Sequence, residues 1–114
     1  MASSGLRGPF PLTDTGIDNN VTKTSPGAYA LGYTNDENAF RISRIGRSDT
    51  DVNNRLHDYI DDYKQFKYEY YASAKAAFEK ECRLYHDFKP PDNKVHPARP
   101  NGTGWKCPVC NGFD

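Results

Sequence analysis

The sequence is short of cysteine, of excess charge and of long apolar runs. It has 3 cysteines in 114 residues, an odd number that argues against a framework of disulfides. Its 15 basic and 15 acidic side chains cancel, which argues weakly against broad, non-specific nucleic-acid binding. No apolar run is long enough to cross a bilayer, and no signal-peptide pattern opens the chain. We therefore expect a reduced, cytoplasmic protein without a membrane partner.

Aromatic side chains supply the apolar area that a small core needs. The chain has 8 Tyr and 6 Phe, and each can bury a large surface. Residues 1–24 are instead rich in Gly, Ser, Thr, Asn and Pro and show no apolar period, which predicts a flexible or loosely docked arm. Composition thus divides the chain into this arm, a domain over 25–93 and a loop-rich tail over 94–114.

Apolar periodicity in the domain predicts an α+β fold. Two runs rich in strand formers, 28–33 and 40–46, flank a polar turn and predict an antiparallel hairpin. A helical period over 51–62, alternation over 66–71 and a second helical period over 74–88 complete the order β-β-α-β-α. The expected architecture is a small three-stranded antiparallel sheet flanked by two helices, because such a sheet needs a helical cover.

Short motifs lie on or beside these predicted strands and helices. Gly27-Ala28-Tyr29 opens the first strand, Arg44-Ile45-Gly46 ends the second, and Arg55 lies on the first helix. The second helix carries Glu81 within the pattern Ala-x-x-x-Glu-x-x-Leu, and Asn93 follows the helix shortly after a proline. These motifs, in this order and on these elements, resemble the GIY-YIG nuclease superfamily over roughly 27–93. The second motif begins with Arg where the family usually has Tyr.

The resemblance implies a DNA endonuclease that uses one Mg²⁺ or Mn²⁺ ion. Glu81 would be the metal ligand, since Mg²⁺ prefers oxygen ligands and keeps several waters. Arg55 would bind the non-bridging phosphate oxygens, and Tyr29 would help to activate the attacking water. Arg44, on the neighbouring strand, could lower the pKa of Tyr29 or hold the phosphate. The candidate catalytic residues are Tyr29, Arg44, Arg55 and Glu81, and the candidate substrate-binding residues are Arg47, Tyr59 and Asn93.

The tail carries a second candidate site. Cys107-Pro108-Val109-Cys110 is a Cys-x-x-Cys knuckle, which can supply two thiolates of a tetrahedral Zn²⁺ site. Cys82 and His86 lie four residues apart on one face of the second helix and are the first choice for the other two ligands. His96 is the substitute. A redox pair is the alternative for the knuckle, although no thioredoxin-like βαβ context surrounds it.

Other interpretations of these residues stay open. Tyr29 is also an ordinary strand aromatic, Arg55 an ordinary solvated helix residue and Cys82 a small half-buried hydrophobe. Glu81 is harder to explain without a role, because an unpaired carboxylate on an apolar stripe is costly to bury. A catalytically weak nucleic-acid-binding or adaptor module with the same fold is the main alternative function. A zinc-knuckle interaction protein is a third.

Overall fold

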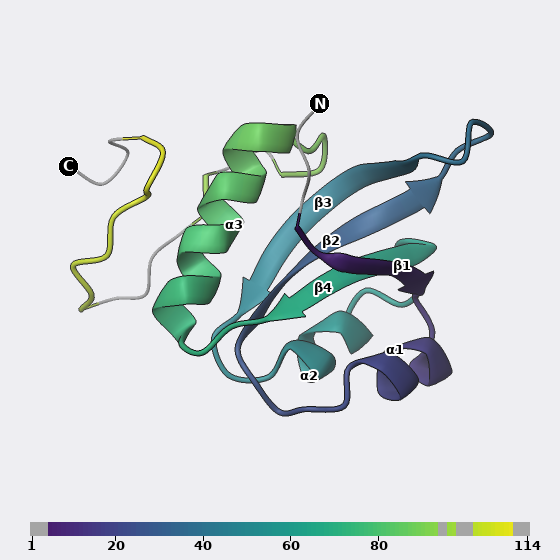
Figure 1. Ribbon diagram of the computed structural model, residues 1–114, viewed down its shortest axis with the longest axis horizontal. Coiled ribbons are helices and arrows are strands. Elements are labelled where there is room, and N and C mark those ends of the chain that lie inside the picture. Colours follow the sequence, from purple (N-terminus) through teal and green to yellow (C-terminus); the bar gives the residue numbers. More distant parts are fainter. Residues whose placement is uncertain (1–4, 94–95, 98–101, 111–114) are drawn as a thin grey trace.

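The computed structural model describes residues 5–93, 96–97 and 102–110. In chain order the elements are β1 (Arg7–Pro11), α1 (Asp14–Asn20), β2 (Gly27–Thr34), β3 (Phe40–Ser48), α2 (Val52–His57), β4 (Gln65–Tyr70) and α3 (Ala74–Phe88). The strands form one antiparallel sheet in the order β1-β4-β2-β3. Figure 1 shows α3 on one side of this sheet and α1 and α2 on the other.

The central strand β2 is buried on both faces, and its alternate side chains pack against the helices on the two sides of the sheet. Tyr29 and Leu31 pack with residues of α1 and α2, whereas Ala28 and Ala30 pack with Leu84 of α3. Small alanines face α3, so that helix lies close to the sheet, and larger residues fill the space beneath the two short helices. The period of two along β2 therefore produces a layered α/β/α arrangement.

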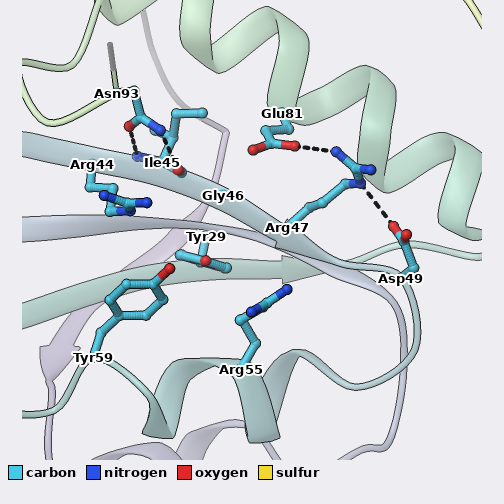
Figure 2. Close-up of a pocket in the computed structure, with 10 residues that line it drawn as sticks. All are labelled: Tyr29, Arg44, Ile45, Gly46, Arg47, Asp49, Arg55, Tyr59, Glu81 and Asn93. Carbon is cyan, nitrogen blue, oxygen red and sulfur yellow. Dashed lines mark hydrogen bonds and ion pairs between the residues drawn. The ribbon is translucent and has the colours of Figure 1, made fainter. Parts of the chain in front are cut away.

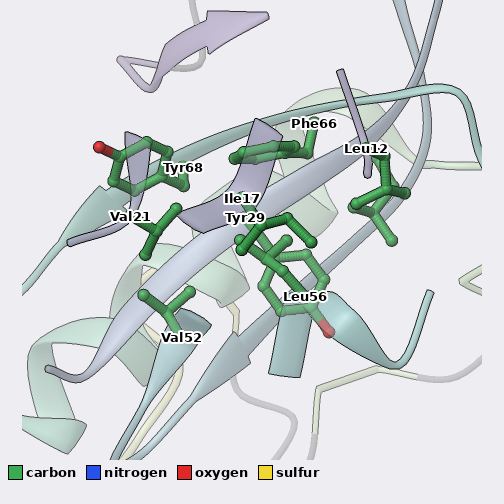
Figure 3. Close-up of a cluster of buried hydrophobic side chains, with 9 residues drawn as sticks. Leu12, Ile17, Val21, Tyr29, Val52, Leu56, Phe66 and Tyr68 are labelled. Atoms are coloured by element: carbon green, nitrogen blue, oxygen red, sulfur yellow. The ribbon is translucent and has the colours of Figure 1, made fainter. Parts of the chain in front are cut away.

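The prediction of three strands and two helices is wrong by one of each. The additional elements, β1 and α1, lie in the segment expected to be a flexible arm. There, Leu12, Ile17 and Val21 belong to the main core (Figure 3), and the Thr13 side chain caps α1 by accepting from the Gly16 N–H. His57 of α2 adds a polar link, since its ring contacts carboxylates of α1. Residues 1–4 lie outside the described part of the chain.

Replacement of Ile17 by alanine tests whether α1 belongs to the folded domain. Ile17 is completely buried, and removal of a buried Ile side chain to Cβ costs about 2–5 kcal/mol. We expect the free energy of unfolding in urea to fall by that amount. Ala72, on the exposed turn before α3, offers a matched site where Ala→Gly is expected to change little. An Ile17→Ala protein as stable as the wild type would restore the flexible-arm interpretation.

The other predicted elements lie close to their expected positions, with one shorter than expected. The helix expected over 51–62 begins after its Asp51 cap and ends at His57. Residues 58–62 form turns, and the acidic Asp58, Asp61 and Asp62 in this stretch are unfavourable at a helix C-terminus because of the helix dipole. The second predicted helix is observed with its expected bounds as α3.

Two local features fix the ends of α3. The Ser73 side chain accepts a hydrogen bond from the Ala76 N–H, which satisfies one of the unpaired donors of the first turn. The helix ends at Phe88, and its C-cap residue Lys89 has a φ of 44°, the left-handed conformation that commonly terminates helices. Pro90 follows and cannot continue the helix.

Within the described residues, no helix combines the length and the apolar character needed to span a bilayer.

Candidate functional site

One pocket gathers all seven residues proposed for catalysis or substrate binding from the sequence. It has a volume of about 280 Å³ and lies where β2, β3, α2 and α3 approach one another (Figure 2). Its lining consists of Tyr29, Arg44, Ile45, Gly46, Arg47, Asp49, Arg55, Tyr59, Glu81 and Asn93. Residues separated by up to 64 positions in the chain therefore converge on a common space that is lined by three arginines and two carboxylates.

The two glycine-containing motifs meet directly in the sheet. Tyr29 of β2 and Gly46 of β3 are cross-strand partners. A Cβ atom placed on Gly46 would overlap the hydroxyl and ring atoms of Tyr29. The absence of a side chain at position 46 thus lets the tyrosine ring lie across the neighbouring strand and bring its hydroxyl to the pocket.

The Tyr29 hydroxyl is held in its protonated form. Burial raises its pKa well above the ordinary value, and the neighbouring Tyr59 raises it further, whereas the positive charge of Arg55 acts in the opposite direction. The cation that acts on the pKa of Tyr29 is Arg55 rather than Arg44, and the other role expected of Arg44, holding the phosphate, stays a prediction. Arg44 lies instead over the ring of Tyr59, with 5.4 Å from its Cζ atom to the ring centroid, and donates to the Asp92 carbonyl at 3.4 Å.

Glu81 lies in a small ion-pair network at the other end of the pocket. Its Oε1 atom accepts a hydrogen bond from Arg47 Nη1 at 2.5 Å, and Arg47 Nε donates to Asp49 Oδ1 at 2.8 Å. Burial raises the pKa of Glu81, while the guanidinium of Arg47 lowers it. Figure 2 draws one carboxylate oxygen of Glu81 toward Arg47 and the other away from it. The carboxylate is therefore partly neutralised and still borders the pocket.

Asp49 also lines the pocket, although it is not among the residues expected there from the sequence. Its carboxylate is on the opposite side of Arg47 from Glu81, and the cap of α2 is supplied by Asp51 instead. An acidic residue three positions after Gly46, just beyond the end of β3, is the signal that could have identified it. The pocket thus offers two carboxylates to a hard cation rather than one.

Arg55 points from α2 toward the same space. Half of its side chain, 51%, is exposed, and its contact with Asp58 is long at 3.8 Å. Its charge nevertheless lowers the pKa of both Tyr29 and Glu81, so it acts electrostatically on the two ends of the pocket. A permanently charged, accessible guanidinium between a hydroxyl and a carboxylate is well suited to bind a phosphate.

The side chain of Asn93 holds the backbone of β3. Its Oδ1 accepts from the Ile45 N–H at 2.6 Å, and its Nδ2 donates to the Ile45 carbonyl at 3.0 Å. Both ends of the side chain are therefore bonded to β3, and Asn93 lines the pocket as well. Asn93 fastens the segment after α3 to the motif strand and so shapes the pocket wall.

A second cluster of potential ligands joins the tail to α3. His86, His96, Cys107 and Cys110 bring one ligand atom each into a group whose members all lie within 4.8 Å of one another. This His₂Cys₂ cluster could hold a metal ion. The helix supplies only His86, and the other three ligands come from the segment that follows it.

The ring nitrogens of the two histidines suit a metal. His86 Nε2 is buried and has no hydrogen-bond partner, which is a costly state for a polar atom unless a ligand satisfies it. His96 Nδ1 lies 2.9 Å from the Pro97 carbonyl, so Nδ1 must carry the proton and donate. This leaves Nε2 as the ring atom that can bind a metal, and it lies 3.4 Å from Cys110 Sγ.

The environment of the knuckle favours a thiolate at Cys107. Burial alone would raise the pKa of this thiol, but backbone hydrogen bonds from Val109 and Cys110, together with His96 and Cys82, lower it to about 6. Backbone N–H groups that point at the first sulfur stabilise the charged form, which is the form that binds metals.

Cys82 is not part of the cluster, contrary to the first-choice ligand set. It is completely buried among Phe78 and Cys107, and burial, followed by the neighbouring Cys107, raises the pKa of its thiol. Spacing on the helix placed it on the same face as His86, but the tail approaches so that the substitute, His96, occupies the fourth position. Cys82 is a packing residue beneath the site.

No protein-family model, curated protein or solved structure matches this chain.

Proposed function

We propose that the protein is a metal-dependent endonuclease that hydrolyses phosphodiester bonds of DNA. The observation that carries this proposal is the convergence of Tyr29, Arg55 and Glu81 on one pocket. A nuclease has to position a water molecule, neutralise the phosphate and stabilise the leaving oxygen. The pocket has a hydroxyl, cationic side chains and carboxylates for these tasks.

Glu81 and Asp49 are the residues that would hold a Mg²⁺ or Mn²⁺ ion. Both carboxylates border the pocket, and oxygen ligands are those that these cations prefer. When bound, the ion supplies Lewis-acid stabilisation of the phosphate and the leaving oxygen. Arg47 balances the two carboxylates, so the pocket does not carry two uncompensated negative charges.

Arg55 is the side chain best placed to bind the scissile phosphate. It is accessible from solvent and its planar guanidinium can donate two parallel hydrogen bonds to phosphate oxygens. Arg44 borders the same pocket from β3 and adds positive charge where the second motif of the family usually has tyrosine. The arginines thereby concentrate positive charge locally in a chain whose total charge is zero.

Tyr29 contributes as a protonated group. Because its pKa is raised, its hydroxyl donates a hydrogen bond and can orient a water molecule or a phosphate oxygen instead of abstracting a proton at neutral pH. Arg55 is the cation that lowers the pKa of Tyr29. A phosphate bound to Arg55 would weaken this lowering, because it neutralises the positive charge. The base that removes the proton from the attacking water is then a group other than Tyr29.

Replacement of Arg55 by alanine tests the proposal without disturbing the core. The side chain is 51% exposed and makes one long ion pair, so we expect an unchanged melting temperature. Loss of a phosphate-binding donor should lower the rate of plasmid cleavage by about 10²-fold. Arg41, an exposed arginine of the same sheet that does not line the pocket, provides the control, and Arg41→Ala should cleave normally. Equal loss in both variants would indicate general charge attraction rather than a catalytic pocket.

Binding of DNA without cleavage would favour the alternative function, a nucleic-acid-binding module with the same fold. The protonated state of Tyr29 is the observation that favours this alternative, because a protonated hydroxyl does not act as a base. Fluorescence anisotropy with a labelled duplex, measured with Mg²⁺ and with EDTA, separates the two. Tight binding in both conditions together with no cut product would support the binding module.

We further propose that the ion of the His₂Cys₂ cluster is Zn²⁺. Two thiolates and two imidazoles form a ligand set typical of structural zinc. A tetrahedral ion with bonds of about 2.0–2.3 Å requires ligand atoms somewhat closer together than the 4.8 Å limit of the present cluster, so a small contraction would complete the site. The proposed role is to fasten the tail to α3.

Zinc content in two cysteine variants distinguishes the ligand sets. Protein purified without added metal is expected to contain about one zinc per chain, as one tetrahedral site requires. Cys110→Ser should lose most of this zinc, because a ligand is removed. Cys82→Ala should keep it, since Cys82 lies outside the cluster. Loss of zinc by Cys82→Ala as well as by Cys110→Ser would reinstate the original ligand set, and a wild-type protein without zinc would refute the site.

A further inference from the structure

The tail and α3 share a small apolar cluster directly behind the pocket. Phe78, Cys82 and Cys107 are its buried members, and Trp105 and Cys110 pack against them. Two of these residues come from α3 and three from the tail. Cys107 and Cys110 are also members of the His₂Cys₂ cluster, so metal binding and apolar packing act on the same stretch of chain.

Phe78 lies between the tail and the pocket. Its ring is completely buried and lies 5.7 Å, centroid to centroid, from the ring of Trp105, at an interplanar angle of 43°. The guanidinium carbon of Arg47 lies 5.1 Å from the centre of the same Phe78 ring. This distance is within the range of a cation–π contact. One aromatic ring therefore contacts a tail residue and a pocket residue.

Arg47 contacts this ring and also both carboxylates of the pocket. Its Nε atom donates to Asp49 and its Nη1 atom to Glu81, and only 13% of the side chain is exposed. A planar guanidinium that is bound at two edges and packed against a ring has little freedom. Displacement of Phe78 would change the support of Arg47 and, with it, the separation and orientation of Glu81 and Asp49.

Trp105 lies close in the chain to the two cysteines of the His₂Cys₂ cluster. Trp105 precedes Cys107 by two residues, which limits its Cα to about 7 Å from that of the ligand. Cys107 and Cys110 in turn share the cluster with His86 of α3, the helix that also carries Phe78 and Glu81. A metal ion that holds the knuckle on this helix therefore keeps the indole near Phe78.

We propose that the metal-held tail is a positioning element for the pocket, in which Trp105 supports Phe78, and Phe78 supports Arg47 between Glu81 and Asp49. That this pocket is catalytic rests on the proposed function; the physical link between tail and pocket does not. Trp105 and Phe78 are positioning residues, since neither lines the pocket. In this arrangement the tail is a structural part of the nuclease domain rather than an appended binding module.

The side-chain Nε–H resonance of Arg47 in a ¹H–¹⁵N spectrum tests this link without substrate. Arg47→Lys identifies the peak by removing it. In the wild type, the hydrogen bond to Asp49 and the nearby ring should shift this peak away from those of exposed arginines and protect it from exchange. We expect Trp105→Ala in the full-length chain to move the peak toward the exposed-arginine position or to broaden it beyond detection. Removal of zinc from the wild type with a chelator should have the same effect.

Two internal comparisons make the result specific. Val109 lies in the knuckle and is exposed, but it is not a ligand, so Val109→Ala should leave the Arg47 peak unchanged. The Nε–H of Arg7, which donates to Glu69 at the far side of the sheet, should stay in place in every sample. Backbone amide peaks of β2 report whether each variant is folded, and Trp105→Leu replaces Trp105→Ala if the latter does not fold.

An unchanged Arg47 peak in folded Trp105→Ala, or in folded protein from which zinc has been removed, would overturn the proposal. A wild-type protein that binds no zinc would overturn its metal-held part. Since no step depends on cleavage, a protein that shows the coupled change but does not cut DNA would refute the proposed function and leave this inference standing.

Discussion

Replacement of Glu81 by glutamine is expected to reduce DNA cleavage by about 10³-fold, the upper end of the loss for one electrostatic group of an active site. Glutamine has nearly the same shape and still offers an oxygen to Arg47, but it removes the negative charge that a Mg²⁺ ion requires. Cleavage of supercoiled plasmid at several Mg²⁺ concentrations measures the effect. Saturating Mg²⁺ should not restore the rate, because the substitution removes a ligand.

The same substitution has a smaller effect on stability. Arg47 keeps its hydrogen bond to Asp49 and exchanges a charged acceptor for a neutral one, so the free energy of unfolding should fall by only about 1 kcal/mol. Glu79 lies on the same helix and does not line the pocket, which makes Glu79→Gln the matched control. If Glu81→Gln cuts as fast as Glu79→Gln, Glu81 is not the metal ligand.

Replacement of Gly46 by alanine is expected to impair both stability and activity. The new Cβ would overlap the hydroxyl and ring of Tyr29, and Tyr29 is buried and packed in the main core. Insertion of a methyl group into such a packed site typically costs about 1–3 kcal/mol. The ring has to move, which displaces its hydroxyl from the pocket, so we expect cleavage to fall together with the urea midpoint.

Gly104 provides the comparison for this substitution. A Cβ at Gly104 would meet no atom within 4 Å, and the residue is exposed in the tail. Gly104→Ala should therefore stay within about 0.5 kcal/mol of the wild type. A Gly46→Ala protein with the stability and activity of Gly104→Ala would contradict the close approach of Tyr29 to β3.

The parts of the fold with strong periodicity could be predicted from the sequence. The stripe that ends at Phe88 and the stop at Pro90 gave α3 its observed bounds, and alternating residues around a polar turn gave the hairpin of β2 and β3. These signals are local, because each element carries both its own apolar pattern and its own end signals.

The N-terminal elements could not be predicted in the same way. Ile17 is a single apolar residue in a stretch of Asp, Asn and Gly, and only tertiary contacts with the sheet make it a core residue. Strand β1 contains two prolines and pairs with β4, a strand more than fifty residues later in the chain. Pairing at this separation leaves no short-range signal, and the proline content is typical of edge strands.

The site was accessible to sequence reasoning only in part. Motif order indicated which residues lie around the pocket, since the hairpin and the two helices place them by topology. It could not show that both ends of the Asn93 amide bind Ile45, or that Asp49 shares Arg47 with Glu81. The choice of His96 over Cys82 depends on the path of the tail, which spacing along one helix does not determine.

The most direct test of the central claim is incubation of the purified full-length protein with supercoiled plasmid and Mg²⁺ or Mn²⁺, in parallel with EDTA and with Arg55→Ala. The pocket geometry predicts nicked or linear products with the wild type and metal alone, with little product in the two other reactions. Intact plasmid under every condition, or equal cutting by Arg55→Ala and the wild type, would contradict the assignment of this pocket as a nuclease active site.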